Sequence, residues 1–194
     1  MSTLKEKHSH HSVVSLNIGQ YYACKSGEVI RTLLGSCVST CLFDPQAGVA
    51  GMNHILLPHI ADMHKFDLNA RYGIHAMEML INEMIQLGAR RTRLQAKAFG
   101  GANVLTTATA GSTPGTKNIE FIKEYLELEK IPLLASDFGG NFTRVLFFHT
   151  DTFEVYIRKT EPALRNLAMQ QEEELVRAVS DEKDYSGDII LFDE

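Results

Sequence analysis

The sequence predicts an α+β fold in which two long helices pack on a mostly antiparallel sheet. Two observations lead to this prediction. Only two long segments carry apolar residues at helical spacing, whereas a larger number of short segments have the alternation and residue types of strands. This proportion fits helices gathered on an antiparallel sheet, and it does not fit a doubly wound fold.

The strands are expected on both sides of the first long helix, where turn residues separate short apolar runs. Before that helix they are Val13–Ile18, Tyr21–Lys25, Glu28–Leu34, Cys37–Phe43 and Val49–Leu56. After it they are Arg93–Ala98, Ile131–Ser136, Phe142–His149 and Phe153–Lys159. The run from Asp44 to Gly48, Asp-Pro-Gln-Ala-Gly, is a strong turn signal, so the two strands beside it are expected to form a hairpin.

The first long helix is predicted over Ala70–Leu87, with Asn69 as its N-cap and Gly88 as its stop. The second is predicted over Thr116–Glu129. Each has an apolar stripe at helical spacing. The stripes are Ile74, Met77, Ile81, Met84 and Ile85 in the first helix, and Ile119, Ile122 and Leu126 in the second. The segments Pro58–Asn69 and Asn103–Gly115 are expected to be loops.

Composition favours an ordinary soluble protein. The chain has 194 residues, a net charge of −5 and 44% hydrophobic residues, so it can bury a sizeable core without metals or disulfides. The acidic balance argues against a nucleic-acid surface, and no apolar run approaches the roughly 20 residues of a membrane span. Three cysteines make a poor disulfide framework, and the polar N-terminus is no secretory signal, so we expect a cytoplasmic protein.

The chain is expected to comprise three parts. Residues 1–12 are polar and His-rich and read as a disordered leader. Residues 13–160 form one domain. Residues 161–194 are an acidic, helix-prone tail that ends in the short apolar segment Ile189–Phe192, which could dock on the domain or on another chain.

The hairpin brings a thiol and an imidazole together. If its loop spans Pro45 to Gly48 and Phe43 pairs with Gly48, then Cys37 lies directly opposite His54. Directly opposed residues of an antiparallel pair have Cβ atoms about 4.5–5.5 Å apart on one face of the sheet. That is the reach which a Cys–His nucleophilic pair requires.

Four neighbouring residues are candidates to complete such a site. Gly35 and Ser36 precede the cysteine, and backbone there can approach a substrate closely and supply donors to an oxyanion. Thr32, Ser36 and Asn53 are the polar side chains near enough to orient the imidazole of a triad. Thr32 would bond to His54 if its strand borders the hairpin.

Two other interpretations of the cysteines stay open at this point. A strand cysteine near a strand histidine is often only core packing, since free Cys is among the most buried residue types. The other interpretation is a redox or metal cluster of Cys37 and Cys41 with His54. On a strand these cysteines lie about 13 Å apart, beyond the ~7 Å Cα limit of a disulfide and too far for shared zinc ligation. We therefore predict no metal and no cofactor.

Several motifs resemble those of the chemoreceptor glutamine deamidases, the CheD family. The likeness runs from about Val13 to Lys159. The motifs that carry it are Thr-Leu-Leu-Gly-Ser-Cys-Val from Thr32, Cys-Leu-Phe-Asp from Cys41, Gly-Met-Asn-His-Ile-Leu-Leu-Pro from Gly51, Lys-Ala-Phe-Gly-Gly-Ala from Lys97, Gly-Thr-Lys-Asn from Gly115 and Asp-Phe-Gly-Gly from Asp137. The segment from Pro114 to Asn118 departs from the family's usual Ile-Gly-x-Arg-Asn.

The resemblance implies a catalytic triad of Cys37, His54 and Thr32 that hydrolyses glutamine side chains of methyl-accepting chemotaxis receptors through a Cys thioester. It implies an amidohydrolase acting on protein-bound glutamine, with ammonia as a product. It also implies a fold of helices on stacked sheets (α/β/β layers) similar to bacterial toxin deamidases. A CheC-type phosphatase is an implied partner, whereas nucleic acid and membrane insertion are not expected.

Two further functional classes remain from the residues. The first is a non-catalytic adaptor that keeps the fold and binds CheC or receptors. The second is a thiol redox or metal sensor built on Cys37 and Cys41. Intact Cys37 and His54 argue against the first, and the strand spacing argues against the second.

Overall fold

The computed structural model describes residues 12–25, 27–57, 66–103, 113–160, 166, 168 and 170–174. The expected disordered leader, apart from Ser12, and the apolar segment Ile189–Phe192 lie outside these residues. In the described part of the chain, no helix has the length and apolar character that crossing a membrane requires.

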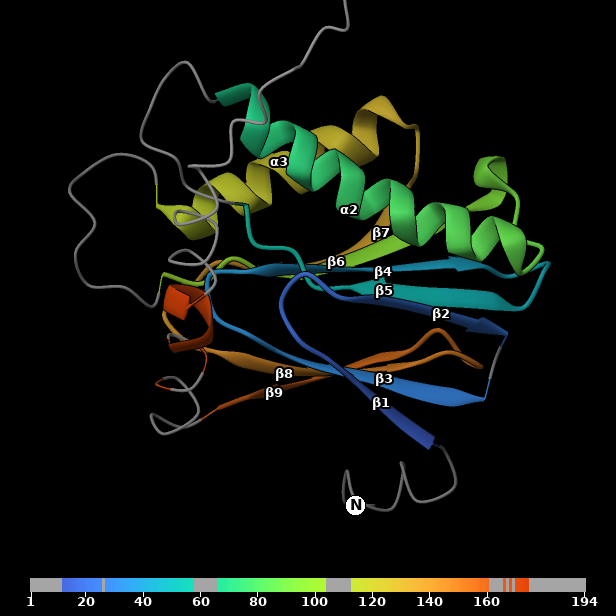
Figure 1. Cartoon of the computed structure of the whole chain (residues 1–194). Coiled ribbons are helices and arrows are strands. Elements are labelled where there is room, and N and C mark those ends of the chain that lie inside the picture. Colours follow the sequence, from blue (N-terminus) through green and yellow to red (C-terminus); the bar gives the residue numbers. More distant parts are fainter. Residues whose placement is uncertain are drawn as a thin grey trace, which may run out of the picture.

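The strands form two sheets (Figure 1). The four-stranded sheet has the order β1-β3-β8-β9, and the five-stranded sheet has the order β2-β5-β4-β6-β7. The first consists of β1 (Ser12–Leu16), β3 (Glu28–Leu34), β8 (Arg144–His149) and β9 (Val155–Lys159). The second consists of β2 (Tyr21–Lys25), β5 (Val49–Asn53), β4 (Val38–Asp44), β6 (Gln95–Gly100) and β7 (Leu133–Phe138). The pairs β1–β3 and β6–β7 are parallel, and the other described pairings are antiparallel.

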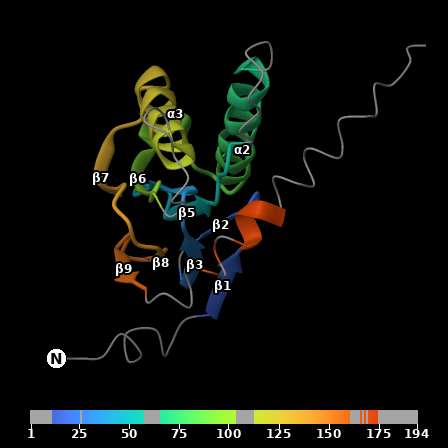
Figure 2. The same cartoon turned by 90° about the vertical axis from the view of Figure 1, so that its left-hand side faces the viewer.

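Two long helices lie side by side on one face of the five-stranded sheet (Figure 2). Helix α2 (Phe66–Gln86) contacts β2 and β5, and α3 (Pro114–Leu128) contacts β4 and β6. The 3-10 turn η2 (Arg91–Arg93) leads into β6. The four-stranded sheet covers the opposite face. The α+β class predicted from the sequence, with two long helices and mostly antiparallel sheets, is confirmed.

Every residue of β4 is buried because both faces of this strand are covered. Successive side chains point to opposite faces. Val38 and Leu42 join the core beneath the helices. Cys41 and Phe43 join the core between the two sheets, as does Cys37 just before the strand.

Both helices begin earlier than predicted. Helix α2 starts at Phe66, so Asn69 is an interior residue and the predicted N-cap is wrong. Asn is favoured at caps but is also tolerated inside helices, so the residue type alone does not fix where a helix begins. Helix α3 starts at Pro114, and its N-cap is Thr113, whose side chain accepts a hydrogen bond from Thr116 N. Proline at the first helical position is common, because its missing N–H would have had no partner there.

The hairpin forms as predicted, but its register differs by two residues. Asp44 pairs with Val49, and the bridge between Val38 and Ile55 continues the same register. Cys37 therefore lies opposite Leu56, and the prediction that it directly faces His54 is wrong. The Asp44 carboxylate accepts hydrogen bonds from the N–H groups of Gln46 and Ala47, which fixes a four-residue loop between Asp44 and Val49.

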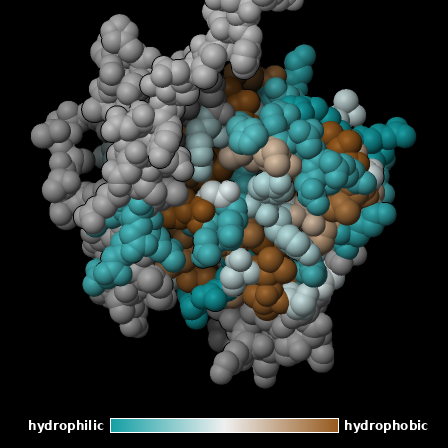
Figure 3. Space-filling model, in the orientation of Figure 1, coloured by the Kyte–Doolittle hydropathy of each residue, from teal (hydrophilic) through white to brown (hydrophobic). Residues whose placement is uncertain are grey.

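The outer surface mixes polar and apolar side chains. Hydrophilic residues are interspersed with hydrophobic ones on the face shown in Figure 3. The large exposed hydrophobic residues come from several elements, and they are Val13, Ile74, Met79, Ile85, Leu128 and Leu134. Apolar residues scattered in this way are normal on a folded surface.

Gly100 sets the end of β6 against the backbone of Cys37. Its φ is +117°, and a Cβ at this position would overlap the Cys37 carbonyl oxygen. We expect Gly100→Ala to lower the free energy of unfolding by about 3 kcal/mol, because backbone has to move.

The matched control for this effect is Gly48→Ala. Gly48 also has a positive φ, of +63°, but a Cβ there meets nothing within 4 Å. This variant should lose only about 1 kcal/mol, the strain of the left-handed conformation. Urea unfolding of both variants measures the difference, and equal losses would contradict the proposed overlap.

Candidate active site

The segment Gly35–Cys37 joins β3 to β4 and is held along its length. Each of its three carbonyl groups accepts a hydrogen bond from another part of the fold. The donors are Ala102 N to Gly35 O at 2.9 Å, Asn118 Nδ2 to Ser36 O at 2.9 Å, and Gly101 N to Cys37 O at 2.7 Å. Because these donors come from the end of β6 and from α3, the backbone beside the thiol is fixed by distant elements.

His54 follows β5 directly and is 1% exposed. Its Nδ1 lies 2.8 Å from Thr32 Oγ1, and the same hydroxyl donates to Leu16 O at 2.9 Å. A threonine hydroxyl has one hydrogen. With that hydrogen on Leu16 O, the Nδ1–H of His54 is the donor to Thr32, and Nε2 carries the free lone pair. This buried Nε2 has no hydrogen-bond partner among the described residues.

Thr32 approaches His54 from the other sheet. From the sequence, a bond between Thr32 and His54 required the strand of Thr32 to border the hairpin. In the structure β3 belongs to the four-stranded sheet and the hairpin to the five-stranded sheet, and the bond forms nonetheless. The hydrogen bond therefore crosses the space between the sheets. Thr32 is 3% exposed, so water has little access to this contact.

Cys37 and His54 lie on the same side of the five-stranded sheet. Cys37 is opposite Leu56 in the continued register, and His54 is two residues before Leu56. Residues related in this diagonal way have Cα atoms about 7–8 Å apart and their side chains share a face. Cys37 is fully buried. The register thus puts Cys37 and His54 on one face of the sheet, and Thr32 bonds His54 there, but the Cys37 thiol makes no hydrogen bond to His54 Nε2 in this arrangement.

A fourth side chain, Glu172, contacts the segment Gly35–Cys37. Its Oε1 accepts a hydrogen bond from Ser36 N at 2.8 Å, and its Oε2 accepts one from Ser36 Oγ at 2.6 Å. The Cys37 thiol also donates to Oε1, at 3.4 Å. Glu172 is 6% exposed and belongs to the helical residues 170–174 of the tail.

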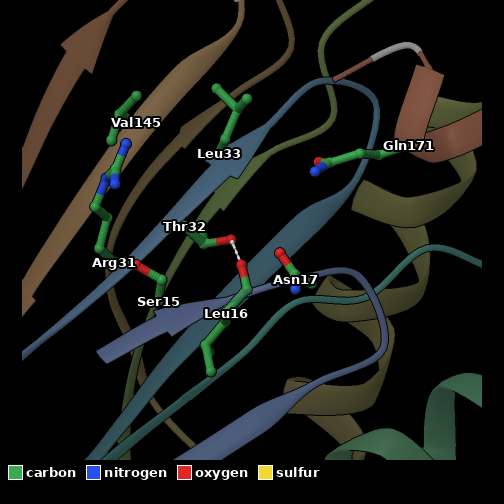
Figure 4. Close-up of a pocket in the computed structure, with 8 residues that line it drawn as sticks. All are labelled: Ser15, Leu16, Asn17, Arg31, Thr32, Leu33, Val145 and Gln171. Carbon is green, nitrogen blue, oxygen red and sulfur yellow. Dashed lines mark hydrogen bonds between the residues drawn. The ribbon is translucent and has the colours of Figure 1, made fainter. Parts of the chain in front are cut away.

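Gln171 lies beside a pocket next to Thr32. Figure 4 shows its side chain directed toward Thr32 on β3 and toward Asn17, which follows β1. The pocket is also lined by residues of β1, β3 and β8, namely Ser15, Leu16, Arg31, Leu33 and Val145. Two neighbouring residues of the tail therefore lie at this place, Gln171 against the pocket and Glu172 against the thiol.

Burial keeps both reacting groups neutral in this arrangement. Loss of solvent lowers the pKa of His54 from 6.5 to about 3. Burial also raises the pKa of the Cys37 thiol well above its usual value, and the negative charge of Glu172 and its hydrogen bond raise that pKa further. At neutral pH the pair is therefore an imidazole and a thiol, and the thiol proton points to Glu172.

Two residues considered from the sequence take other positions. Asn53 lies on the opposite face of β5, where its Oδ1 accepts from Thr40 N at 2.9 Å and its Nδ2 contacts Met77 Sδ of α2. Its side chain does not join Cys37. Cys41 is packed in the core between the sheets, and all three cysteines are free thiols. No group of three or more Cys, His, Asp or Glu side chains within the described ranges is arranged to hold a metal.

Two residues at the site were not singled out by the sequence reasoning. Asn118 is fully buried and bridges the two strand ends, because it bonds Ser36 O and also accepts from Leu57 N at 3.0 Å. Its signal was an asparagine within a helical segment and within a motif of the resemblance. Glu172 lies among several glutamates of the tail, and nothing in its sequence context distinguishes it from them.

Comparison with known proteins gives one family. The family described as CheD chemotactic sensory transduction matches residues 56–159. The "Probable chemoreceptor glutamine deamidase CheD 2" of Shewanella oneidensis is 44% identical over 84% of this chain and 84% of its own length. The "Probable chemoreceptor glutamine deamidase CheD 1" of Geobacter sulfurreducens is 46% identical over 76% of this chain and 77% of its own length. The chain therefore belongs to the CheD family.

Proposed function

We propose that this protein hydrolyses glutamine side chains of chemotaxis receptors to glutamate and releases ammonia. Relatives that share most of its length are named chemoreceptor glutamine deamidases. The observation that supports this chemistry best is the 2.8 Å contact between Thr32 Oγ1 and His54 Nδ1. It leaves Nε2 as the basic nitrogen, on the face of the sheet that Cys37 shares.

In the proposed first step His54 Nε2 takes the proton of the Cys37 thiol, and the sulfur attacks the carboxamide carbon of the substrate. A carbon–sulfur bond forms while the C=O bond opens to an oxyanion. The N–H of Ser36 is the proposed donor to this oxyanion. In the structure it donates to Oε1 of Glu172, the oxygen that lies 3.4 Å from Cys37 Sγ. The carbon–nitrogen bond then breaks, and His54 returns its proton to the leaving ammonia.

In the second step water replaces the thiol. His54 Nε2 removes a proton from the water, which attacks the thioester carbon, and the sulfur leaves and recovers a proton. Overall, one carboxamide and one water give one carboxylic acid and one ammonia. The acid ionises at neutral pH, so each event adds one negative charge to the receptor.

The role proposed for Thr32 is to fix which of the two imidazole nitrogens of His54 carries the hydrogen. Its hydroxyl already donates to Leu16 O, so it accepts from Nδ1–H and keeps the proton off Nε2. Gly35 contributes by its backbone, whose carbonyl is held by Ala102 N. We assign Asn53 no part in the reaction, because its contacts lie on the other face of the sheet.

The finer predictions from the family resemblance remain proposals. They are a CheC-type phosphatase partner, a cytoplasmic location and a fold relationship with bacterial toxin deamidases. The sensor interpretation gains no support, because Cys41 packs in the core with no metal-ligand group around it in the described part of the chain. A non-catalytic adaptor would give no reason for the ordered Thr32–His54 contact.

The central test uses purified receptor and measures ammonia release together with the amide-to-acid mass shift at glutamine. Cys37→Ala and His54→Ala should each abolish both signals, since one removes the nucleophile and the other the base. Cys41→Ser is the matched control, a second buried thiol in the same core, and it should leave deamidation largely intact. Loss of activity in folded Cys41→Ser, or full activity in Cys37→Ala, would refute the assignment.

Thr32 can be tested as a positioning residue. Thr32→Val removes the hydroxyl at nearly constant shape, so we expect kcat to fall roughly 100-fold with little change in KM, because the imidazole loses its orientation. Thr32→Ser keeps the hydroxyl and should restore most of kcat. Steady-state kinetics on receptor fragments measures both, and an unchanged kcat in Thr32→Val would remove Thr32 from the mechanism.

The burial of His54 predicts a pH dependence of stability. Its folded pKa of about 3 lies below the 6.5 of an exposed histidine, so the unfolded chain binds more protons between these values. The stabilisation is fully present above pH 6.5 and is lost as the pH falls toward 3. We expect wild type to lose up to about 1.4 kcal/mol per pH unit more than His54→Gln in this window.

Urea unfolding at several pH values from 4.5 to 7 measures the slope of the unfolding free energy against pH for each protein. The other titrating groups are common to both proteins, so their contributions cancel in the difference between the two slopes. Identical slopes for the two proteins would show that His54 is protonated equally in the folded and unfolded states.

A further inference from the structure

The contact between Glu172 and the segment Gly35–Cys37 resembles the binding of a reaction product. The proposed reaction turns a glutamine side chain into a glutamate side chain. Glu172 presents such a side chain to Cys37, with Oε1 on Ser36 N and Oε2 on Ser36 Oγ. Oε1 lies 3.4 Å from Sγ, so the carboxyl group sits beside the sulfur that would attack a substrate.

The two oxygens of Glu172 correspond to the two polar atoms of a glutamine carboxamide. Oε1, on the backbone N–H of Ser36, takes the place of the carbonyl oxygen that becomes the oxyanion. Oε2, on Ser36 Oγ, takes the place of the amide nitrogen, because a serine hydroxyl can accept a hydrogen bond as well as donate one. Ser36 could thus bind either the substrate or the product side chain.

The Glu172 carboxylate also has few stabilising contacts for a buried charge. Ser36 and Cys37 supply every hydrogen bond that it receives from the described residues, and no Lys or Arg among them forms an ion pair with it. A buried carboxylate without a cation is unfavourable compared with one in water. Such a contact can hold the site closed and still yield to a competing side chain.

We propose that Glu172 is an intramolecular product analogue that occupies the glutamine-binding subsite formed by Ser36 and Cys37, so that its side chain keeps the site closed until a substrate displaces it. This inference rests on the proposed deamidase function for the identity of the subsite. It adds the group that closes the site and the pair of donors that recognise the end of a glutamine side chain.

The first experiment measures access to the thiol and needs no receptor. Iodoacetamide alkylation of Cys37, followed by peptide mass spectrometry, should be about tenfold faster in Glu172→Ala than in wild type, because both the cover and a nearby negative charge are removed. Glu173→Ala is the matched control, since Glu173 is the exposed neighbouring glutamate. It should react like wild type. Equal rates in Glu172→Ala and wild type would overturn the inference.

The second experiment turns the proposed analogue into a substrate. In Glu172→Gln the side chain at position 172 carries a carboxamide beside Cys37, so the protein should hydrolyse it to glutamate with one water consumed and one ammonia released. Mass spectrometry of the tail peptide should show the amide-to-acid shift at a rate that does not depend on protein concentration. The shift should be absent in the double variant with Cys37→Ala and in Glu173→Gln.

The outcomes separate this inference from the proposed function. If wild type deamidates receptor while the amide of folded Glu172→Gln persists, the product-analogue assignment is wrong and the deamidase function stands. If receptor is untouched by wild type and by Glu172→Ala while Glu172→Ala still accelerates alkylation, the tail covers the thiol but the deamidase function fails. Circular dichroism of each variant establishes that it is folded.

Discussion

The hydrogen bond between Thr32 and His54 is the contact on which the rest of the site depends. It joins the two sheets through a pair of buried side chains, at 2.8 Å, and it decides which imidazole nitrogen is basic. Its direction is set one step further away, because Leu16 O takes the only hydroxyl hydrogen of Thr32. Leu16 is held opposite Thr32 by the parallel pairing of β1 with β3, so the first described strand determines the protonation of a histidine in another sheet. Leaving either partner unpaired in such a place costs about 1–3 kcal/mol.

The sequence was most informative where the signals are local. The turn after Asp44 predicted the hairpin, and the strands Tyr21–Lys25 and Glu28–Leu34 match the structure at both ends. The register was wrong by two residues, yet Cys37 and His54 share a face in both versions. Strand side chains repeat every two residues, so an error of two preserves the face, whereas an error of one would have separated the pair.

The parts that the sequence did not reveal depend on contacts between distant segments. Asn53 was a candidate to orient the imidazole, but it is one position away from His54 along the chain and therefore faces α2. The sequence linked Thr32 to His54 only on the condition that neighbouring strands carried them, whereas Thr32 meets His54 from the other sheet, a relation that no local pattern encodes. Glu172 is 135 residues from Cys37, and no local pattern links a glutamate to a thiol at that separation.

The rigid backbone from Gly35 to Cys37 affects how the site would select among receptor glutamines. Its carbonyl groups are hydrogen-bonded to α3 and to residues at the end of β6. The proposed glutamine subsite beside it therefore has the same shape for every glutamine that enters. A rigid subsite that contacts only the carboxamide end of a side chain binds all glutamines equally. Under the proposed function, choice among receptor positions falls to the residues that flank each glutamine and to how well they compete with the tail for the same surface.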